Sequence, residues 1–291
     1  MRTGILLFIL SYTITTFSQG STEIYLFEII KNEEGIKLEN QKNISNNEGY
    51  DNQPFFDSNQ NILFSSTRNQ QTDIASYSIN EETLKWISDT PNGSEYSPNK
   101  IPDSDGISAI RLDTNGKQLL YCYDPETRES QVILEDLKVG YHVWFNNHII
   151  VSSVLEGSSL SLTVSDINKN TNQIIQKNIG RSLHKIPNSD LISYISKENQ
   201  EWKINSLDPL TGVTETIINT IPGAEDLCWL NDGTIIMGKY NKLFSYNPKT
   251  DQKWKTFYTF TGDDDKNIIA ITRLAANAKG NLLAIVSDFA N

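Results

Sequence analysis

A degenerate repeat of roughly 44 residues constrains this chain more than any other feature of its sequence. The clearest copy runs from Asp51 to Arg68 and continues from Thr72 to Ile79. Related segments begin near residues 50, 94, 140, 181, 225 and 268, at intervals of 41 to 46 residues. A fixed period of this length, built from short β runs, is typical of a β-propeller with one four-stranded blade per repeat. The sequence therefore predicts an all-β fold, a six-bladed β-propeller.

The two ends of the chain predict how the propeller closes. The last repeat has room for only two strands, because six residues remain after Ile285. The N-terminal segment Thr22–Ile29 matches the third-strand run Thr72–Ile79, and residues 36–44 match a fourth strand. We therefore expect residues 22–44 to complete the sixth blade, which would remove a free sheet edge. Residues 19–291 then form a single propeller domain.

Residues 1–18 have the pattern of a secretory signal peptide. Arg2 supplies a positively charged N-terminal region, and residues 4–10 are apolar. Thr16 and Ser18 place small side chains at the −3 and −1 positions of a cleavage site. The apolar run is far shorter than the ~20 residues of a membrane span. We expect a periplasmic or secreted protein of a bacterial envelope, with no integral membrane segment after cleavage.

Charge and cysteine content narrow the partners and the compartment. The chain carries 25 Lys and Arg against 36 Asp and Glu, a net charge of −11. An acidic surface repels phosphate backbones, so nucleic acid is not expected as a partner. Cys122 and Cys228 fall in the second and fifth blades, across the propeller from each other, so they should be two buried free thiols. We also expect a monomer.

The first repeat resembles a known family. Residues 53–74 read Gln-Pro-Phe-Phe-Asp-Ser-Asn-Gln-Asn-Ile-Leu-Phe-Ser-Ser-Thr-Arg-Asn-Gln-Gln-Thr-Asp-Ile. This is similar to the WD40-like (PD40) repeat of TolB-like six-bladed propellers, in which a Pro-rich turn precedes an apolar strand, a Ser-x-Arg and an Asp-Ile. Residues 94–98 and 102–103 match in part. The resemblance implies a propeller of a family that includes periplasmic partner-binding proteins.

The repeat alignment also predicts where a site would lie. The inner strands of all six blades start side by side around the central channel, so loops between the fourth and first strands, and between the second and third, should converge there. The candidate ligand-binding residues at these positions are Asp51, Arg68, Glu95, Tyr96, Arg111, Tyr141, His142, Arg181, Ser182, Glu225, Asp226 and Arg273. Arg111, Arg181 and Arg273 could converge on an anionic ligand, or the charges could only neutralise each other around water.

Catalytic chemistry has weaker support in the sequence. No Gly-x-Ser-x-Gly elbow and no convergent zinc-ligand spacing are present. His142 or Asp226 could serve as a general base, although a structural histidine bonded to a neighbouring blade is the simpler interpretation. Glu225 and Asp226 could bind Ca²⁺. The sequence favours a non-catalytic propeller that binds a partner protein or a small polar or anionic ligand. A metal-dependent lactonase or lyase acting on sugar acids is the alternative.

Overall fold

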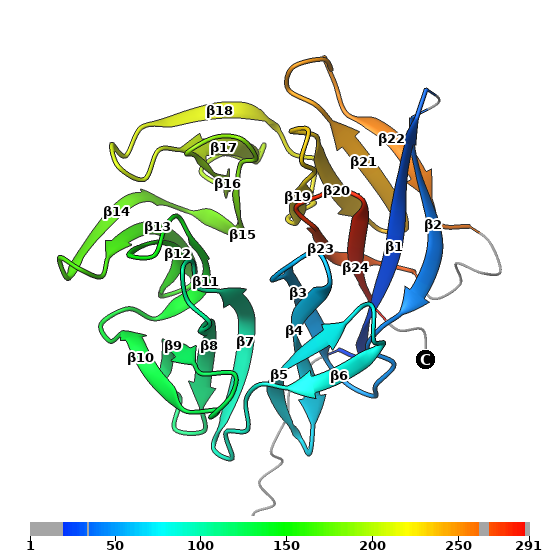
Figure 1. The fold of residues 1–291 in the computed structure, drawn as a ribbon. Helices are drawn as coiled ribbons and strands as arrows, with labels where there is room; N and C mark the ends of the chain where they lie inside the picture. The colour runs from blue at the N-terminus through cyan, green and yellow to red at the C-terminus, as the bar shows by residue number, and fades with distance from the viewer. Residues whose placement is uncertain (1–19, 34, 262–267, 289–291) are drawn as a thin grey trace, which may run out of the picture.

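The computed structural model describes residues 20–33, 35–261 and 268–288, which form six four-stranded antiparallel sheets arranged around a central channel (Figure 1). The predicted signal peptide and the acidic run at residues 263–265 lie outside these described residues. Within them, no helix is long and apolar enough to cross a membrane. The all-β, six-bladed prediction is confirmed.

The first three blades follow the chain in simple up-and-down order, from the inner strand to the outer one. Their strands are, for blade 1, β3 (Asp51–Phe56), β4 (Asn61–Arg68), β5 (Gln71–Ser78) and β6 (Thr83–Trp86); for blade 2, β7 (Gly93–Lys100), β8 (Ile107–Asp113), β9 (Gln118–Tyr123) and β10 (Ser130–Leu134); and for blade 3, β11 (Val139–Trp144), β12 (Ile149–Glu156), β13 (Ser159–Asp166) and β14 (Thr171–Lys177).

The last three blades include the one that joins the two ends of the chain. Their strands are, for blade 4, β15 (Ile179–Lys185), β16 (Ile192–Ser196), β17 (Lys203–Leu207) and β18 (Thr214–Asn219); for blade 5, β19 (Leu227–Trp229), β20 (Ile235–Lys239), β21 (Lys242–Tyr246) and β22 (Lys255–Thr259); and for blade 6, β23 (Ile271–Ala276), β24 (Leu282–Asp288), β1 (Thr22–Asn32) and β2 (Gly35–Asn43).

The N-terminal strand β1 pairs with β24 over seven residues, from Thr22 opposite Asp288 to Glu28 opposite Leu282. The predicted closure of the sixth blade by the N-terminal segment is therefore confirmed. The start of β1 is also tied to blade 1, because the Thr22 amide donates to the Gly49 carbonyl at 2.9 Å. The first and last described strands, β1 and β24, thus lie in one sheet, beside the first blade (Figure 1).

The hydrophobic core consists of layers between neighbouring blades. The second strands are buried on both faces, as β12 shows with six consecutive buried residues from Ile149 to Val154. Their β-branched residues suit a strand covered on both sides. The outer strands are more exposed, and four successive residues of β14 face solvent. Stability therefore depends on contact between blades, which places the inner strands in fixed positions around the channel.

The two cysteines lie in blades 2 and 5 as expected, Cys122 in β9 and Cys228 in β19, and both are free thiols. Cys228 is fully buried, and burial raises the pKa of its thiol. The expectation of two buried thiols is wrong for Cys122, which is partly exposed. Cys122 is the penultimate residue of β9, and its sulfur faces Gly106, which has no side chain to shield it from solvent.

Turns between the first and second strands of blades 4, 5, 6 and 1 are joined on one face of the propeller. The Asn188 amide donates to the Asn231 carbonyl at 3.0 Å, and the Asn231 amide donates to the Lys279 carbonyl at 2.7 Å. The Asn277 amide reaches Asn59 Oδ1 at 3.3 Å, which links blade 6 to blade 1. These A–B turns form a connected rim at the ends of the inner strands.

Candidate functional site in the central channel

Each blade contributes one residue of its inner strand, or of the segment just before it, to a belt around the channel. The six belt residues are Gln53, Ser97, Tyr141, Arg181, Asp226 and Arg273. Five of them occupy equivalent positions in the repeats, 44 residues apart from Gln53 to Ser97 and 47 apart from Asp226 to Arg273, and Arg181 lies one residue before the equivalent position in blade 4. Repetition therefore converts positions far apart in sequence into one contiguous surface.

A bulge in the inner strand turns the belt residue toward the channel in blades 1 and 2. The pairing register shifts between Asn52 and Phe55 in β3, and between Tyr96 and Asn99 in β7. Gln53 (φ 57°) and Ser97 (φ 52°) adopt left-handed backbone conformations at these bulges. Such conformations cost about 1–3 kcal/mol each for residues other than glycine, so surrounding contacts must hold them. Gln53 Oε1 accepts the Ser97 amide at 2.8 Å and provides one such contact.

The charged half of the belt is an ion network across blades 4, 5 and 6. Arg181 Nε lies 2.9 Å from Asp226 Oδ2, and Arg273 Nη1 lies 2.7 Å from the same oxygen. The Arg273 guanidinium also contacts the Tyr141 hydroxyl at 3.4 Å and faces its ring at 5.4 Å. One carboxylate therefore balances two guanidinium groups. The network retains an excess positive charge.

Glu225, next to Asp226, lies 3.9 Å from Arg181 Nε but closer to the ammonium group of Lys197, so it does not remove the excess positive charge. Its carboxylate binds Lys197 Nζ at 2.6 Å and accepts the backbone amide of Arg181 at 3.2 Å. Lys197 also packs over the Trp202 ring, 4.1 Å from the ring centroid. Glu225 and Lys197 thus compensate each other behind the belt.

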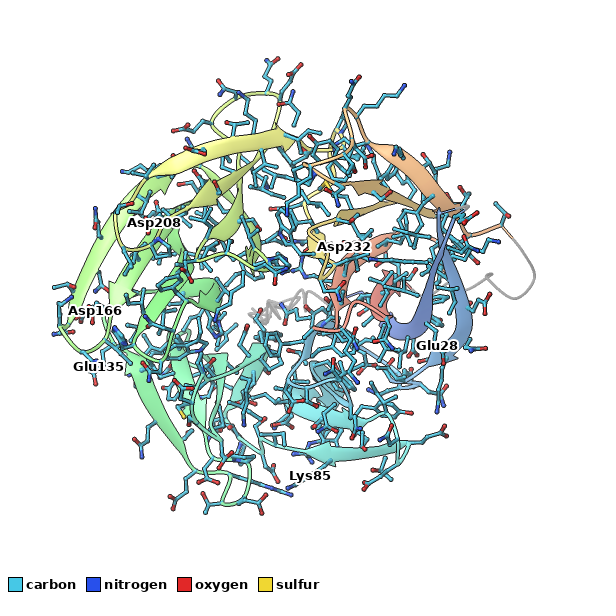
Figure 2. The ribbon with its side chains drawn as sticks, turned by 45° about the horizontal axis from the view of Figure 1, so that its top comes forward. Glu28, Lys85, Glu135, Asp166, Asp208 and Asp232 are labelled. Carbon is cyan, nitrogen blue, oxygen red and sulfur yellow. The ribbon has the colours of Figure 1, made fainter. Side chains whose placement is uncertain are left out.

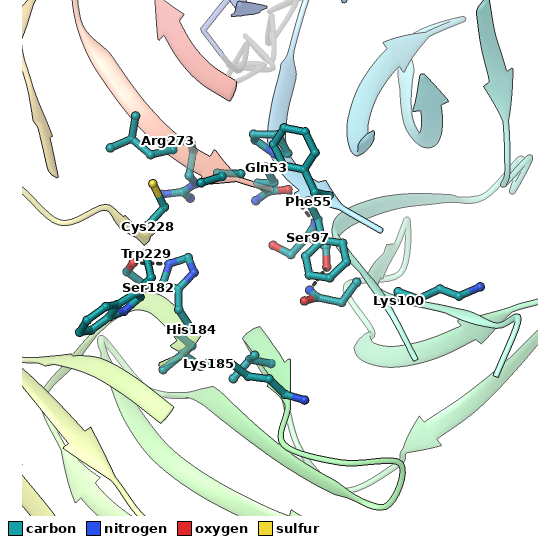
Figure 3. Close-up of a pocket in the computed structure, with 18 of the residues that line it drawn as sticks. Gln53, Phe55, Ser97, Lys100, Ser182, His184, Lys185, Cys228, Trp229 and Arg273 are labelled. Atoms are coloured by element: carbon teal, nitrogen blue, oxygen red, sulfur yellow. Dashed lines mark hydrogen bonds between the residues drawn. The ribbon is translucent and has the colours of Figure 1, made fainter. Parts of the chain in front are cut away.

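A cavity of about 520 Å³ extends from the belt along the inner strands to the A–B turns (Figure 3). This is the face opposite the one at which the sequence analysis placed the convergent loops and the candidate site. The wall between the belt and the turns holds uncharged polar and aromatic side chains, among them Phe55, His184 and Trp229. A second cavity of about 480 Å³ lies on the predicted face, next to Tyr50 and Tyr96, and it shares Gln53 and Tyr141 with the first.

Two lysines, Lys100 and Lys185, stand at the end of the larger cavity that reaches the A–B turns, and we call this end the mouth. Lys100 Nζ donates to the Asp105 carbonyl at 2.8 Å and lies 3.9 Å from the exposed Asp105 carboxylate. Lys185 ends β15, and within the described residues its ammonium group has no ion pair. Burial lowers the pKa of Lys185, and Asp103 offsets part of this effect.

The two histidines of the cavity wall are neutral hydrogen-bonding groups. Burial lowers the pKa of His142 to about 3, and burial lowers that of His184 to about 4 despite the nearby Asp226. His142 Nε2 lies 2.7 Å from Ser108 Oγ in blade 2, which is the predicted bond to a neighbouring blade. His184 Nε2 lies 3.0 Å from the predicted site residue Ser182. Asp226 binds guanidinium groups, so the structure does not join it to His142 as a catalytic pair.

Asp51 and Glu95 precede the bulges and do not line the larger cavity, contrary to the sequence prediction. Both are fully buried between blades. Glu95 accepts from Ser88 Oγ at 2.9 Å and from the Tyr123 hydroxyl at 3.0 Å. In a regular strand, residues two apart share a face, but the bulges break this alternation and give the channel side to Gln53 and Ser97.

Arg68 and Arg111 also lie outside the cavity. Arg68 binds Asp73 at 2.7 Å and stacks on Trp86 at 4.3 Å. Arg111 stacks on Tyr121, 3.7 Å from its ring centroid. Both side chains are held by aromatic rings of their own blade, so Arg111 does not converge with Arg181 and Arg273 as the sequence suggested.

The residues proposed for Ca²⁺ do not form a suitable ligand set. Calcium requires six to eight oxygen ligands, several of them from carboxylates. Asp226 is bound by two guanidinium groups and Glu225 by Lys197. Across the part of the chain that the structure describes, no three His, Cys, Asp or Glu side chains could share a metal ion.

Glu95 should make stability depend on pH. Burial raises its pKa to about 7, and the nearby Asp73 adds to this effect, whereas an unfolded glutamate has a pKa of about 4.3. The folded state therefore binds more protons between pH 4 and 7, so the free energy of unfolding should fall across this range as pH rises. We expect Glu95→Gln to remove about 1–3 kcal/mol of this fall, measured by denaturant unfolding at a series of pH values.

Asp51 provides the comparison for that experiment. Burial raises its pKa to about 7 as well, so Asp51→Asn should remove a second part of the same pH dependence. An unchanged slope in both variants would contradict the assignment of these two carboxyl groups as protonated in the folded protein at mildly acidic pH.

The cavity residues that were not among the sequence-predicted site residues include Ser97, Lys100, His184 and Lys185. The exact spacing of 44 residues that relates Ser97 to Gln53 would have identified it. The lysines could have been found by following each inner strand to its far end, because alternate residues of a strand share one face.

Comparisons with known proteins support the fold alone. No family model and no curated protein sequence matches the chain. A structure described as a TolB from Agrobacterium tumefaciens has a TM-score of 0.70 at 11% identity and covers 94% of this chain and 100% of its own. A chain of a nidogen/laminin complex has a TM-score of 0.65 at 8% identity, covering 87% and 97%. An oligogalacturonate lyase from Vibrio parahaemolyticus has a TM-score of 0.53 at 12% identity, covering 93% and 98%.

Proposed function

Taking the TolB-like six-bladed propeller as the scaffold, we propose that this protein is an exported, non-catalytic binding protein that holds a small anionic ligand in its central channel. The observation that carries this proposal is the charge of the larger cavity. Its wall includes four cationic side chains, Lys100, Arg181, Lys185 and Arg273, and one carboxylate, Asp226. The whole chain has a net charge of −11.

This contrast favours a specific anion site over a generally charged surface. Acidic residues such as Glu135, Asp166 and Asp208 lie on the outer side of the propeller (Figure 2). The Arg181 and Arg273 side chains are 30% and 12% exposed, and such partly withdrawn cations interact more strongly with an anion than the exposed Lys185 does. Guanidinium groups also present paired donors that match a carboxylate. A positive interior in a negative protein therefore fits a small anion that can enter the channel.

Thermal unfolding with a panel of small carboxylates, sugar acids and inorganic phosphate tests the proposal. A ligand at a hundred times its Kd stabilises the folded state by about 2.7 kcal/mol, which raises Tm by several degrees. Arg181→Gln should abolish this shift while changing the free energy of unfolding of the ligand-free protein by only about 1 kcal/mol. The change is small because Asp226 keeps its ion pair with Arg273 and Glu225 keeps its ion pair with Lys197.

The matched control is Lys85→Gln, which removes one positive charge from an exposed pair with Glu126 far from the channel. It should leave the ligand shift unchanged. If no anion in the panel raises the Tm of the wild-type protein, the small-ligand proposal fails, and a protein partner becomes the better explanation of the scaffold.

The export part of the proposal rests on the sequence of residues 1–18, and it is tested by expressing the complete chain in a bacterium and sequencing the N-terminus of the product. We expect cleavage after Ser18. Recovery of uncleaved protein from the cytoplasm would contradict it.

A further inference from the structure

The cationic side chains of the channel lie in two groups, at opposite ends of the larger cavity. Arg181 and Arg273 belong to the belt, whereas Lys100 and Lys185 stand at the mouth. Strand β15 contributes one residue to each group, Arg181 and Lys185. Four residues of fully extended β-strand span roughly 13 Å. Because β15 is bulged between Ile179 and Leu183, the two groups are separated by about that distance or less along the channel.

The wall between the two groups is uncharged. Ser182, His184 and Trp229 lie around this part of the opening, and Figure 3 shows them between Arg273 and Lys185. His184 is neutral, because burial lowers its pKa to about 4. The Trp229 indole N–H is already bound to Ser193 Oγ at 2.8 Å, so this ring offers the cavity only apolar surface and edge contacts. A ligand in this segment therefore meets neutral hydrogen-bonding and aromatic groups.

Each end of the cavity has positive charge that the described residues leave uncompensated. At the belt, two guanidinium groups share one oxygen of Asp226. At the mouth, Lys100 is paired with the exposed Asp105, whereas Lys185 has no ion pair within the described part of the chain and feels only the charge of Asp103, on the β7–β8 turn of blade 2. A single small anion can satisfy one end only.

We propose that the channel binds an elongated dianion, with one anionic group at Arg181 and Arg273, the other at Lys185 and Lys100, and an uncharged middle. This inference rests on the proposed anion-binding function and specifies its ligand class. The two charges should lie on the order of 10 Å apart, given the spacing of the two groups along β15. Long aliphatic dicarboxylates and short oligomers of acidic sugars both have this chemistry.

Calorimetric titration with α,ω-dicarboxylates of increasing length, from succinate upward, tests the proposal, with monocarboxylates of the same chain lengths as references. A second set of titrations uses uronic-acid monomers, dimers and trimers and separates the two chemical sources. We expect affinity to pass through a maximum at one length, where the dianion binds about 10- to 100-fold more tightly than the matching monoanion.

Lys185→Gln should remove this advantage, so that the best dianion binds no more tightly than its monoanion, whereas monoanion binding at the belt stays unchanged. Lys85→Gln, an exposed lysine outside the channel, should preserve the length optimum. Monoanions that bind while dianions of every length gain nothing would overturn the two-ended ligand and leave the anion site standing. Undiminished preference for the dianion in Lys185→Gln would also overturn it. Absence of binding by every anion would instead overturn the proposed function itself.

Discussion

Deletion of residues 22–44 is expected to abolish cooperative folding of the whole propeller. Strand β1 alternates between two interfaces: Tyr25 and Phe27 pack in the core shared with blade 5, and Ile24 and Leu26 pack in the core shared with blade 1. Burial of each large apolar side chain contributes about 1.5–3 kcal/mol, so these four side chains together contribute about 6–12 kcal/mol, which is comparable with the 5–15 kcal/mol by which a domain is typically stable.

The measurement is thermal and denaturant unfolding of the truncated chain, followed by circular dichroism and tryptophan fluorescence. The control begins at Gly20, where the described residues begin, and it should unfold in one transition like the protein cleaved after Ser18. A chain lacking residues 22–44 that still melts cooperatively near the wild-type temperature would show that blades 1 to 5 form a stable unit without closure.

The Phe27→Ala variant gives a graded version of the same test. Phe27 is 2% exposed, and its ring packs against Phe260 of blade 5 with a centroid distance of 5.6 Å. Removing a buried phenylalanine costs about 3–5 kcal/mol. Its loss should destabilise the whole protein in a single transition, because the interface with blade 5 belongs to the closed propeller and not to one blade.

Most of the fold could be predicted from the sequence because each blade repeats the same local pattern. The run Asn61–Ser65 carries the apolar residues of a buried strand, and Pro, Asn and Gly mark the turns. The match of Thr22–Ile29 to Thr72–Ile79 was sufficient to predict closure. The strand and turn pattern is local and the match between segments comes from the repeat. Both can be recognised without knowing how any side chain is oriented.

The candidate site could be predicted only in part, because its geometry depends on local shifts in the pairing register of the inner strands. Tyr141, Arg181, Asp226 and Arg273 were found where the repeat alignment was in register with the channel. In blades 1 and 2 the bulges exchange the two faces, so Asp51 and Glu95 were chosen where Gln53 and Ser97 face the cavity. Nothing in the local sequence reveals which of the polar residues at the start of an inner strand a bulge will turn inward.

Replacement of Asp226 by asparagine should destabilise the empty protein and strengthen anion binding at the same time. The Asp226 side chain is 13% exposed and forms ion pairs with both guanidinium groups of the belt. Loss of its charge leaves two partly buried cations facing each other, which we expect to cost about 2–4 kcal/mol in the free energy of unfolding. The same change removes the one carboxylate of the cavity wall, so an anion no longer competes with it.

Denaturant unfolding and calorimetric titration of Asp226→Asn, at low and high salt, separate the two effects. The variant should lose stability in the absence of ligand and recover part of it as a carboxylate or chloride is added, since bound anions replace the missing charge. Its affinity for small carboxylates should exceed that of the wild type by about tenfold, consistent with one added charge-assisted hydrogen bond. Glu126→Gln changes the net charge equally at an exposed site outside the channel. It should neither destabilise the protein nor raise its affinity for anions. An Asp226→Asn protein that is destabilised but gains no anion affinity would contradict the proposal. It would mean that the belt arginines stabilise the fold and do not bind a ligand.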